Sequence, residues 1–289
     1  MECELWPQLY RIVVRAGRKM PRARVRYSDA LIVLVLLWSC LHDRPVSWAC
    51  DARNWAATRA KPVRLPSDST VSRRLCSTRV LALMRIIAAD LRETTLPSLW
   101  KILDGKCLII SSCSKDPDAR PGFAVRRLGL GYKLHVIYGE RLMPEAWDVR
   151  PLNVNEKDVA HDLLTELEGG GYLLADGQYD SSRLHDACRR HNHQLFTPRS
   201  SRPSPKGYGH RYNSPHRMHS IEMLGREFGQ AMLERRKAIE RYFGHATIFG
   251  GGLAPLPAWV RRQHRVKRWL WAKLLINAVR IKLHEGLTA

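Results

Sequence analysis

The hydrophobic pattern of the chain changes near Leu99, and this change limits the folds that the chain can adopt. Before Leu99, apolar residues recur at helical spacing, as in segments 30–41 and 80–93, and no segment alternates as a strand does. After Leu99, short apolar runs are bounded by turn residues. We therefore expect an all-helical region over residues 1–97, followed by a strand-rich α/β domain over residues 98–289.

The order of the segments after Leu99 predicts a mixed sheet. Three strand candidates, "KILDGKCLIIS", "GYKLHVIYG" and "MPEAWDVRPL", precede a helix-like "NEKDVAHDLLTELEG" and a further strand, "GYLLADGQY". This order fits an antiparallel meander that a helical crossover joins to a parallel strand, as in ribonuclease-H-like sheets. A doubly wound nucleotide-binding fold is the competing interpretation, but the chain has neither a G-x-G-x-x-G nor a G-x-x-x-x-G-K-[ST] motif to support it.

Helical periodicity returns toward the C-terminus. We expect a helix at "SRLHDACRRHN", a short strand at "QLFTP", a helix over 221–243 with Glu240 near its C-terminal end, and a last basic helix over about 258–284. The segment 199–220 between them has five Arg or Lys, prolines, glycines and no acid. It is typical of a basic loop, whose tyrosines either stack on unpaired bases or are simply solvated.

The chain carries a large positive charge. It has 48 Lys and Arg against 27 Asp and Glu, a formal net charge of +21, and Arg outnumbers Lys by about three to one. Such an excess of one sign opposes compaction unless a polyanion relieves it, and the guanidinium fork suits phosphate and guanine. We therefore expect a nucleic-acid partner, in preference to the alternative of a well-solvated basic surface.

Cysteine usage and hydropathy indicate the compartment. The seven cysteines are odd in number, scattered and without a Cys-x-x-Cys pair, which argues against a disulfide framework and a zinc site. The longest apolar run, at residues 30–41, is shorter than the roughly 20 residues needed to span a bilayer, and no signal-peptide cleavage site follows it. We expect a cytoplasmic protein without a membrane partner.

The segment 65–75, "LPSDSTVSRRL", is a candidate DNA-binding element in the helical region. A proline and several cap residues precede Arg73 and Arg74, which is how a short helix presented to DNA begins. A helix-turn-helix is one interpretation of this segment. An ordinary surface helix with a good cap is the other.

Three acidic residues, Asp104, Asp176 and Glu240, each end or interrupt a different apolar segment. Carboxylate oxygens are the ligands that Mg²⁺ prefers, and two such ions can activate a water and stabilise a leaving oxygen at a phosphodiester. If the sheet brings the three acids together, a divalent ion relieves their mutual repulsion. The pattern therefore predicts metal-dependent chemistry on nucleic acid.

Each acid has a structural alternative. Asp104 stands before a glycine, as in a turn, although a turn there would sever one strand candidate. Asp180 is a rival to Asp176, or else the N-cap of the following helix. Glu234 is the rival to Glu240, since the two lie on different faces of one expected helix.

Three basic or titratable residues lie close to the expected site. Arg236 lies one helical turn before Glu240, where it positions that acid, holds a phosphate, or makes an ordinary exposed ion pair. Lys133 and His135 share one face of the second strand candidate. They either contact the scissile strand or are merely solvated.

These motifs resemble, in order, those of the bacterial insertion-sequence transposases, which carry a DDE catalytic triad on a ribonuclease-H-like fold. The similar stretches, from about residue 99 to 280, are "ILDGK", "SCSKDPDAR", "GLGYKLHVI", "LLADGQYDS" and "RRKAIERYFG". The stretch "LPSDSTVSRRL" is similar to the helical DNA-binding region ahead of the catalytic domain. The resemblance implies Asp104, Asp176 and Glu240 as the three acids, separated by 72 (176 − 104) and 64 (240 − 176) residues.

The chain departs from the family's pattern around the third acid. The family group often has Tyr, Arg, Glu and Lys at fixed intervals there. Arg236 and Glu240 match this pattern, whereas Leu233 stands at the Tyr position and Thr247 at the Lys position. The resemblance is therefore weaker for Glu240 than for the two aspartates.

The resemblance implies a transposase that binds the terminal inverted repeats of its element, cleaves a phosphodiester there and joins the freed 3′-hydroxyl to target DNA. It implies two Mg²⁺ ions held by the three acids, with Mn²⁺ as a substitute, and a homodimer on double-stranded DNA in the bacterial nucleoid. The residues expected to contact DNA are Arg73, Arg74, Lys133, His135, Arg236, Arg261 and Arg262. The alternatives are a catalytically inactive transposase acting as a sequence-specific repressor, and a structure-selective nuclease.

Overall fold

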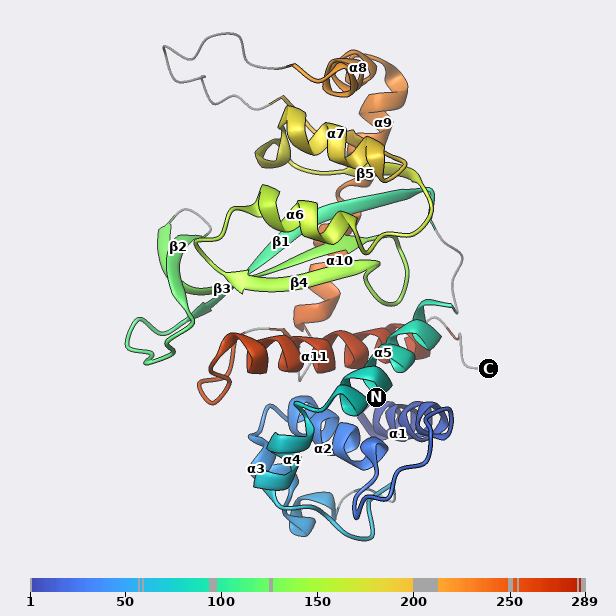
Figure 1. The fold of residues 1–289 in the computed structure, drawn as a ribbon, viewed down its shortest axis with the longest axis vertical. Coiled ribbons are helices and arrows are strands. Elements are labelled where there is room, and N and C mark those ends of the chain that lie inside the picture. The colour runs from blue at the N-terminus through green and yellow to red at the C-terminus, as the bar shows by residue number, and fades with distance from the viewer. Residues whose placement is uncertain are drawn as a thin grey trace. The chain divides into compact units, whose positions relative to one another are not determined.

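The structure is a computed structural model that describes residues 2–56, 58, 60–93, 98–124, 127–199, 213–248, 252, 253, 255–284 and 286. The chain forms two compact units (Figure 1): a helical unit, Met1–Thr95 with His245–Ala289, and a sheet unit, Leu96–Gly244. The predicted boundary after residue 97 lies two residues from this division. The C-terminal helix, however, belongs to the helical unit, and not with the sheet as expected.

The helical unit is built around one almost fully buried helix, α2. Eleven of its thirteen residues are buried, which explains why the run at 30–41 is apolar on every side. Helices α1, α5 and α11 pack against it. The helices of this unit are α1 (Glu2–Arg18), α2 (Asp29–Leu41), α3 (Val46–Ala49), the 3₁₀ turn η1 (Ala52–Trp55), α4 (Asp68–Arg74), α5 (Thr78–Arg92) and α11 (Gln263–His284).

Serine caps begin three of these helices. Ser28, Ser67 and Ser77 each accept a hydrogen bond from a backbone N–H in the first turn of α2, α4 and α5. The helix expected to start near Ser67 is thereby confirmed. Helices α3 and η1 remain two short pieces, because Asp51 between them adopts an extended backbone and caps the second piece.

The sheet unit contains one mixed six-stranded sheet, as expected. Its order is β2-β3-β1-β5-β6, with β4 also paired to β3; β1 is antiparallel to β3 and parallel to β5, and β5 is parallel to β6. This is the ribonuclease-H-like arrangement of an antiparallel meander joined to parallel strands. The strands are β1 (Trp100–Ile110), β2 (Arg120–Ala124), β3 (Arg127–Tyr138), β4 (Ala146–Pro151), β5 (Gly171–Leu174) and β6 (His193–Phe196).

Strand β2 was not expected from the sequence. Its residues, "RPGFA", include a proline and a glycine, which are depleted in strands. Gly122 is required by a close approach: a Cβ placed there would lie 2.5 Å from the carbonyl oxygen of Leu152. Strand β2 therefore forms despite its turn-like composition, and its glycine permits the close approach to Leu152.

Helices cover both faces of the sheet. Leu103, Ile137 and Leu173 belong to a buried apolar cluster with α6 and α7, which therefore lie on one face. Helix α10 packs on the other face, where the ring of Tyr242 stacks on Tyr138 with centroids 4.3 Å apart (Figure 1). The helices of this unit are α6 (Glu156–Leu164), the 3₁₀ turn η2 (Gly177–Tyr179), α7 (Ser182–Arg190), α8 (Pro215–Leu224), α9 (Glu227–Arg235) and α10 (Ala238–Ile248).

The prediction of a single helix over 221–243 is wrong. The structure has three helices there, because α8 ends at Gly225, Arg226 is extended, and α9 ends at Arg236. Glu240 consequently lies in the first turn of α10 and not near the end of a long helix. The basic loop expected at 199–220 lies mostly outside the described residues.

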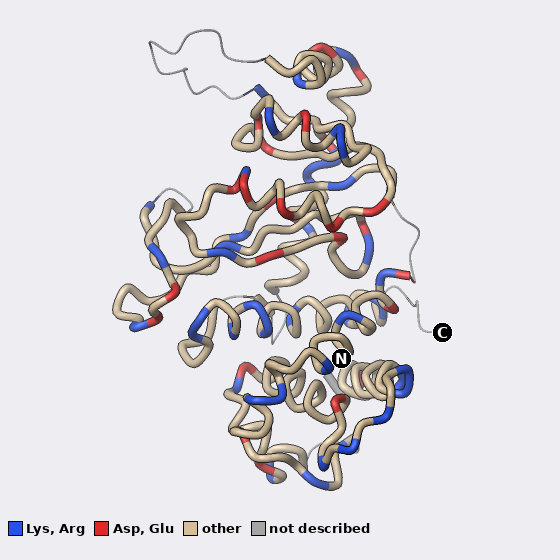
Figure 2. Tube along the Cα trace, viewed as in Figure 1, with Lys and Arg blue, Asp and Glu red and all other residues tan. Residues whose placement is uncertain are grey.

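Basic residues occur in both units, and α11 carries several Lys and Arg with no Asp or Glu (Figure 2). No helix in the part of the chain that the structure describes is long and apolar enough to cross a membrane.

Candidate active site

The sheet brings Asp104 and Asp176 to the same level. Strands β1 and β5 run parallel, and their last recorded pair is Ile102 with Leu174. Two residues further along each chain are Asp104, still within β1, and Asp176, which follows β5 with an extended backbone. The two carboxylates expected from the sequence are therefore neighbours, and the interpretation of Asp104 as part of a strand is confirmed.

Asp104 lies on the face of the sheet that α10 covers. Because side chains alternate along a strand, Asp104 shares the face of Ile102, the partner of Tyr138, and is opposite to Leu103. The next residue, Gly105, is held tightly: a Cβ there would lie 2.7 Å from Cε of Lys133. Gly105, which had allowed the alternative of a turn after Asp104, is thus explained by the Lys133 side chain that lies across β1 at this point.

Burial and charge perturb the Asp104 carboxyl. Its pKa is raised to about 6, chiefly by burial and also by the charges of Asp176 and Glu156, against the lowering effects of the Gly105 N–H and the charge of Arg236. The Gly105 N–H donates to Oδ1 at 2.7 Å. A carboxylate that is both desolvated and next to another acid is typical of a functional site.

Asp176 is fixed by the turn that follows β5. Its Oδ1 accepts a hydrogen bond from the Gln178 N–H at 2.8 Å, and its carbonyl accepts one from Thr197 Oγ1 at 2.6 Å. Thr197, at the end of β6, is buried. The side-chain hydroxyl of Thr197, which follows the neighbouring parallel strand β6, therefore helps to hold Asp176 in place beside Asp104.

Glu156 is a third acid in this region that sequence reasoning missed. It stands in the first turn of α6, forms an ion pair with Lys133, and its charge reaches Asp104. The buried hydroxyl of Tyr179 lies against the same carboxylate, and burial with that charge raises the tyrosine pKa well above its usual value. The acid is visible in the sequence "NEKDVAHDLL", but its position there is that of an ordinary acidic residue in the first turn of a helix after the Asn155 cap.

Glu240 is exposed in the first turn of α10 and is not brought to the two aspartates. The buried residues of this part of α10 are Ala238, Ile239 and Tyr242, which lie on other sides of the helix. The rival acid, Glu234, is also exposed and pairs with Lys237. The charge of Arg236, at the junction of α9 and α10, does reach Asp104.

A metal centre of three side chains is not assembled here. Across the described residues, no group of three or more His, Cys, Asp or Glu is arranged to hold a metal ion. Asp104 and Asp176 nevertheless fit a divalent cation. They are two hard carboxylate donors side by side, and a cation would offset both the burial and the repulsion that raise the pKa of Asp104.

Two residues expected to contact DNA near this site are engaged within the protein. Lys133 forms the ion pair with Glu156, and only 14% of its side chain is exposed. His135 is 1% exposed, on the face that α6 covers, and burial lowers its pKa to about 4. A direct DNA contact by His135 is therefore not supported, because α6 covers the face of β3 on which its side chain lies.

The arginines of the helical unit also differ from one another. Arg73 is exposed, but Arg74 donates to the buried Asp29 carboxylate at 2.6 Å and to the Tyr27 carbonyl at 3.0 Å. Arg74 thus joins α4 to α2 and is not presented to solvent as expected. The side chains of Arg261 and Arg262, ahead of α11, are exposed.

Asp180 is neither a second ligand nor an N-cap in this structure. Ser181 caps α7, while the buried Asp180 carboxylate accepts two hydrogen bonds from Arg217 of α8, at 2.6 and 2.7 Å. This ion pair anchors α8 to the turn after Asp176. Asp180 therefore has a structural role next to the site.

Comparison with known proteins identifies the family of the chain. A family model described as the transposase DDE domain matches residues 102–276, more than half of the chain, so the chain belongs to this family. The matched segment contains Asp104, Asp176 and Glu240. Such domains are found in enzymes that cleave and transfer DNA strands.

The chain is similar to the structure titled "Cryo-EM structure of piggyBac transposase synaptic complex with hairpin DNA (SNHP)", with 8% identity and a TM-score of 0.40, covering 98% of this chain and 74% of that chain. No curated protein matches. The family assignment rests on the domain match.

Proposed function

We propose that the chain is the transposase of a bacterial insertion sequence. It binds the terminal inverted repeats of its element, hydrolyses a phosphodiester at the element end and directs the freed 3′-hydroxyl onto target DNA. What supports this proposal most is that Asp104 and Asp176 each lie two residues beyond the paired Ile102 and Leu174, in a chain of the transposase DDE family.

Asp104 and Asp176 would hold Mg²⁺, for which Mn²⁺ would substitute, and Glu240 is the proposed third acid. When bound, two such ions supply Lewis-acid activation of water and stabilisation of the leaving oxygen. The protein's own contribution is to hold two carboxylates together against their repulsion, through the central strand and the Thr197 bond. Arg236 is positioned to bind a phosphate oxygen next to Asp104.

Four arginines are the proposed DNA contacts. The exposed Arg73, Arg261 and Arg262 belong to the helical unit, and the half-buried Arg236 belongs to the candidate site. Because exposed Arg contacts phosphate, replacing each should weaken binding and reduce its salt dependence. A homodimer that holds two element ends is part of this proposal, and the mass of the complex on repeat DNA tests it.

The exposed position of Glu240 favours a second function. If its carboxylate never joins the aspartates, the chain is a sequence-specific DNA-binding protein without cleavage, acting as a repressor at the inverted repeats. In that case repeat binding is tight and no Mg²⁺-dependent cut appears. The two functions therefore differ in one measurable product.

The decisive experiment incubates the purified protein with labelled duplex carrying the inverted repeats that flank its gene, with and without Mg²⁺, and maps the ends. Transposase activity gives metal-dependent 3′-hydroxyl ends at the repeat boundary, which Asp176→Asn and Glu240→Gln abolish. Glu234→Gln is the matched control, because Glu234 is an exposed acid in the adjoining helix α9. Cuts in any duplex would indicate a nuclease, and binding without cuts would indicate the repressor.

A further inference from the structure

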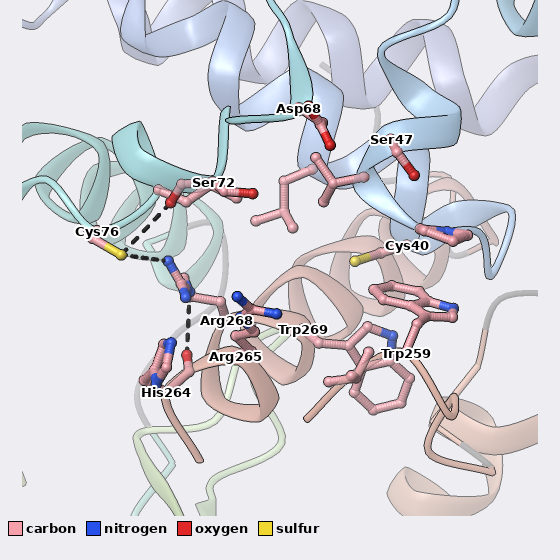
Figure 3. Close-up of a pocket in the computed structure, with 15 residues that line it drawn as sticks. Cys40, Ser47, Asp68, Ser72, Cys76, Trp259, His264, Arg265, Arg268 and Trp269 are labelled. Atoms are coloured by element: carbon pink, nitrogen blue, oxygen red, sulfur yellow. Dashed lines mark hydrogen bonds between the residues drawn. The ribbon is translucent and has the colours of Figure 1, made fainter. Parts of the chain in front are cut away.

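The helical unit encloses a cavity of about 280 Å³, far in the sequence from the acidic site (Figure 3). Helices α2, α3 and α4, the segment before α11 and the first turns of α11 line it. This volume is close to the lower end of the range of small-molecule sites, about 300 to 1,000 Å³. The cavity is therefore large enough for a planar ligand of modest size.

One wall of the cavity is apolar and aromatic and carries one unsatisfied donor. Buried side chains such as Cys40, Leu75 and Val260 line it, together with Trp259 and Trp269. Trp269 is 2% exposed, and its indole Nε1 is buried with no hydrogen-bond partner among the described residues. Because an unpaired buried N–H costs about 1 to 3 kcal/mol, this donor calls for an acceptor on a ligand.

The cavity also has a basic side (Figure 3). Arg268 is held there, since its guanidinium donates to Cys76 Sγ at 3.1 Å and to the His264 carbonyl at 3.2 Å. Arg265 is exposed, and its side chain makes no ion pair with another described residue. Asp68 is the one acid among the residues that line the cavity.

We propose that this cavity binds a nucleotide, with its base between the tryptophans and its phosphate on Arg265 and Arg268. An aliphatic ligand would leave the Trp269 N–H without an acceptor, and inorganic phosphate alone would leave the apolar walls uncovered. A base supplies a flat aromatic face and ring or carbonyl acceptors, and the phosphate supplies the anion. The exposed Arg73 follows the cavity residue Ser72 on α4, so a nucleotide joined to a longer strand would continue onto a basic helix.

This site is independent of cleavage chemistry, because none of its residues belongs to the sheet unit. The shared ligand chemistry has two sources: a free mononucleotide, or an unpaired nucleotide within DNA. The test therefore uses both. Calorimetry measures dAMP, deoxyadenosine and inorganic phosphate, and 2-aminopurine fluorescence measures a duplex with one unpaired 2-aminopurine against the same duplex fully paired.

Three variants test the three contacts in the full-length protein. Trp259→Ala removes stacking, Trp269→Phe removes the N–H while keeping an aromatic ring, and Arg265→Ala removes a phosphate contact. Stacking on an aromatic side chain is worth about 1 to 3 kcal/mol per base, so Trp259→Ala should raise Kd by about fivefold or more. Arg85→Ala is the matched control, since Arg85 is exposed on α5 and outside the cavity.

The expected result has a specific pattern. The wild type binds dAMP or quenches the unpaired 2-aminopurine, Trp269→Phe and Trp259→Ala weaken both, and Arg265→Ala weakens dAMP but leaves deoxyadenosine unchanged. Binding of dAMP alone identifies a free nucleotide, and quenching in the bulged duplex alone identifies a DNA nucleotide. Equal behaviour of all variants and Arg85→Ala, with unchanged thermal unfolding, would overturn the proposal. Inorganic phosphate binding as tightly as dAMP would also overturn it.

Asp176→Asn separates this inference from the proposed function. That variant lacks a proposed acid of the sheet unit but keeps the cavity, so its nucleotide binding should equal that of the wild type. Loss of cleavage with normal nucleotide binding leaves the cavity proposal standing.

Discussion

At the scale of single residues, the chain places charged and titratable groups where their ionisation is costly. Burial and the charge of Asp176 disfavour the ionised form of Asp104, whose pKa is raised to about 6. His135 is buried on the opposite face of the same sheet, and its pKa falls to about 4. The raised pKa of Asp104 opposes folding at neutral pH, and the lowered pKa of His135 opposes folding at mildly acidic pH. Shifts of this kind are typical of residues that are kept for reasons other than stability.

We predict that Asp104→Asn stabilises the protein at pH 8 without divalent ions. The folded-state pKa of Asp104 is raised, so the ionised carboxylate opposes folding above pH 6, whereas Asn is neutral and still accepts the Gly105 N–H. The gain should be about 1 to 3 kcal/mol and should largely disappear near pH 4, where the carboxyl is protonated in the folded state and about half protonated in the unfolded chain. Urea unfolding at the two pH values measures it; a less stable variant at pH 8 would contradict the argument.

For His135 we predict the opposite pH dependence, with a loss of stability in mild acid. Its folded-state pKa lies below the unfolded value, so the unfolded chain takes up the proton first, and stability falls as the pH drops from about 6.5 to about 4. His135→Leu removes this loss, of up to about 3 kcal/mol, and leaves no ring nitrogens unpaired. Thermal unfolding from pH 7.5 to 4 should therefore show a flatter profile in the variant; an unchanged slope would refute it.

At the scale of elements, one buried carboxylate organises the N-terminal helices. Asp29, in the first turn of α2, accepts hydrogen bonds from Arg74 of α4 and Arg79 of α5, at 2.6 and 3.0 Å. Asp29 is 6% exposed, so its charge requires these partners. The packing of α2, α4 and α5 thus depends on a polar contact as well as on apolar burial.

We predict that Asp29→Asn destabilises the protein by about 3 kcal/mol, because removing one partner of a buried ion pair leaves the other charges uncompensated. The measurement is urea unfolding at neutral pH. Asp51→Asn is the matched control: Asp51 pairs with Arg53 on the surface, 89% of whose side chain is exposed, and such pairs contribute little. Similar losses in both variants would contradict the assignment of Asp29 as the organising residue.

At the scale of the whole molecule, the ends of the chain meet in one unit while the sheet lies between them in sequence. Helix α11 packs on α2, and the buried Lys273 donates to the Cys40 carbonyl at 2.7 Å and to Asp43 at 2.6 Å. The N-terminal helices therefore complete their core only after the C-terminus has been synthesised. The sheet unit, by contrast, is continuous in sequence.

We predict that a fragment of residues 98–244 folds alone, whereas a fragment of residues 1–93 does not. The second fragment lacks α11, so the apolar surface of α2 stays uncovered. Circular dichroism and urea unfolding of each fragment would test this. Restoring folding by adding a peptide of residues 252–286 to the short fragment would support the argument further, and cooperative unfolding of 1–93 alone would contradict it.

Whether Asp104 and Asp176 lie together depended on the register of β1 against β5, two strands that are far apart in the sequence. The sequence alone determined the change from a helical to a strand-rich pattern near Leu99 and the order of strand and helix around the sheet, because hydrophobic periodicity is a local property of the chain. It did not reveal strand β2, the division of segment 221–243 into three helices, or the position of Glu156, since these depend on contacts between distant segments. The burial of His135 and Arg74 also depends on which helix covers each side chain. Tertiary structure decided these because a side chain's exposure is set by its neighbours in space, which spacing along the chain does not encode.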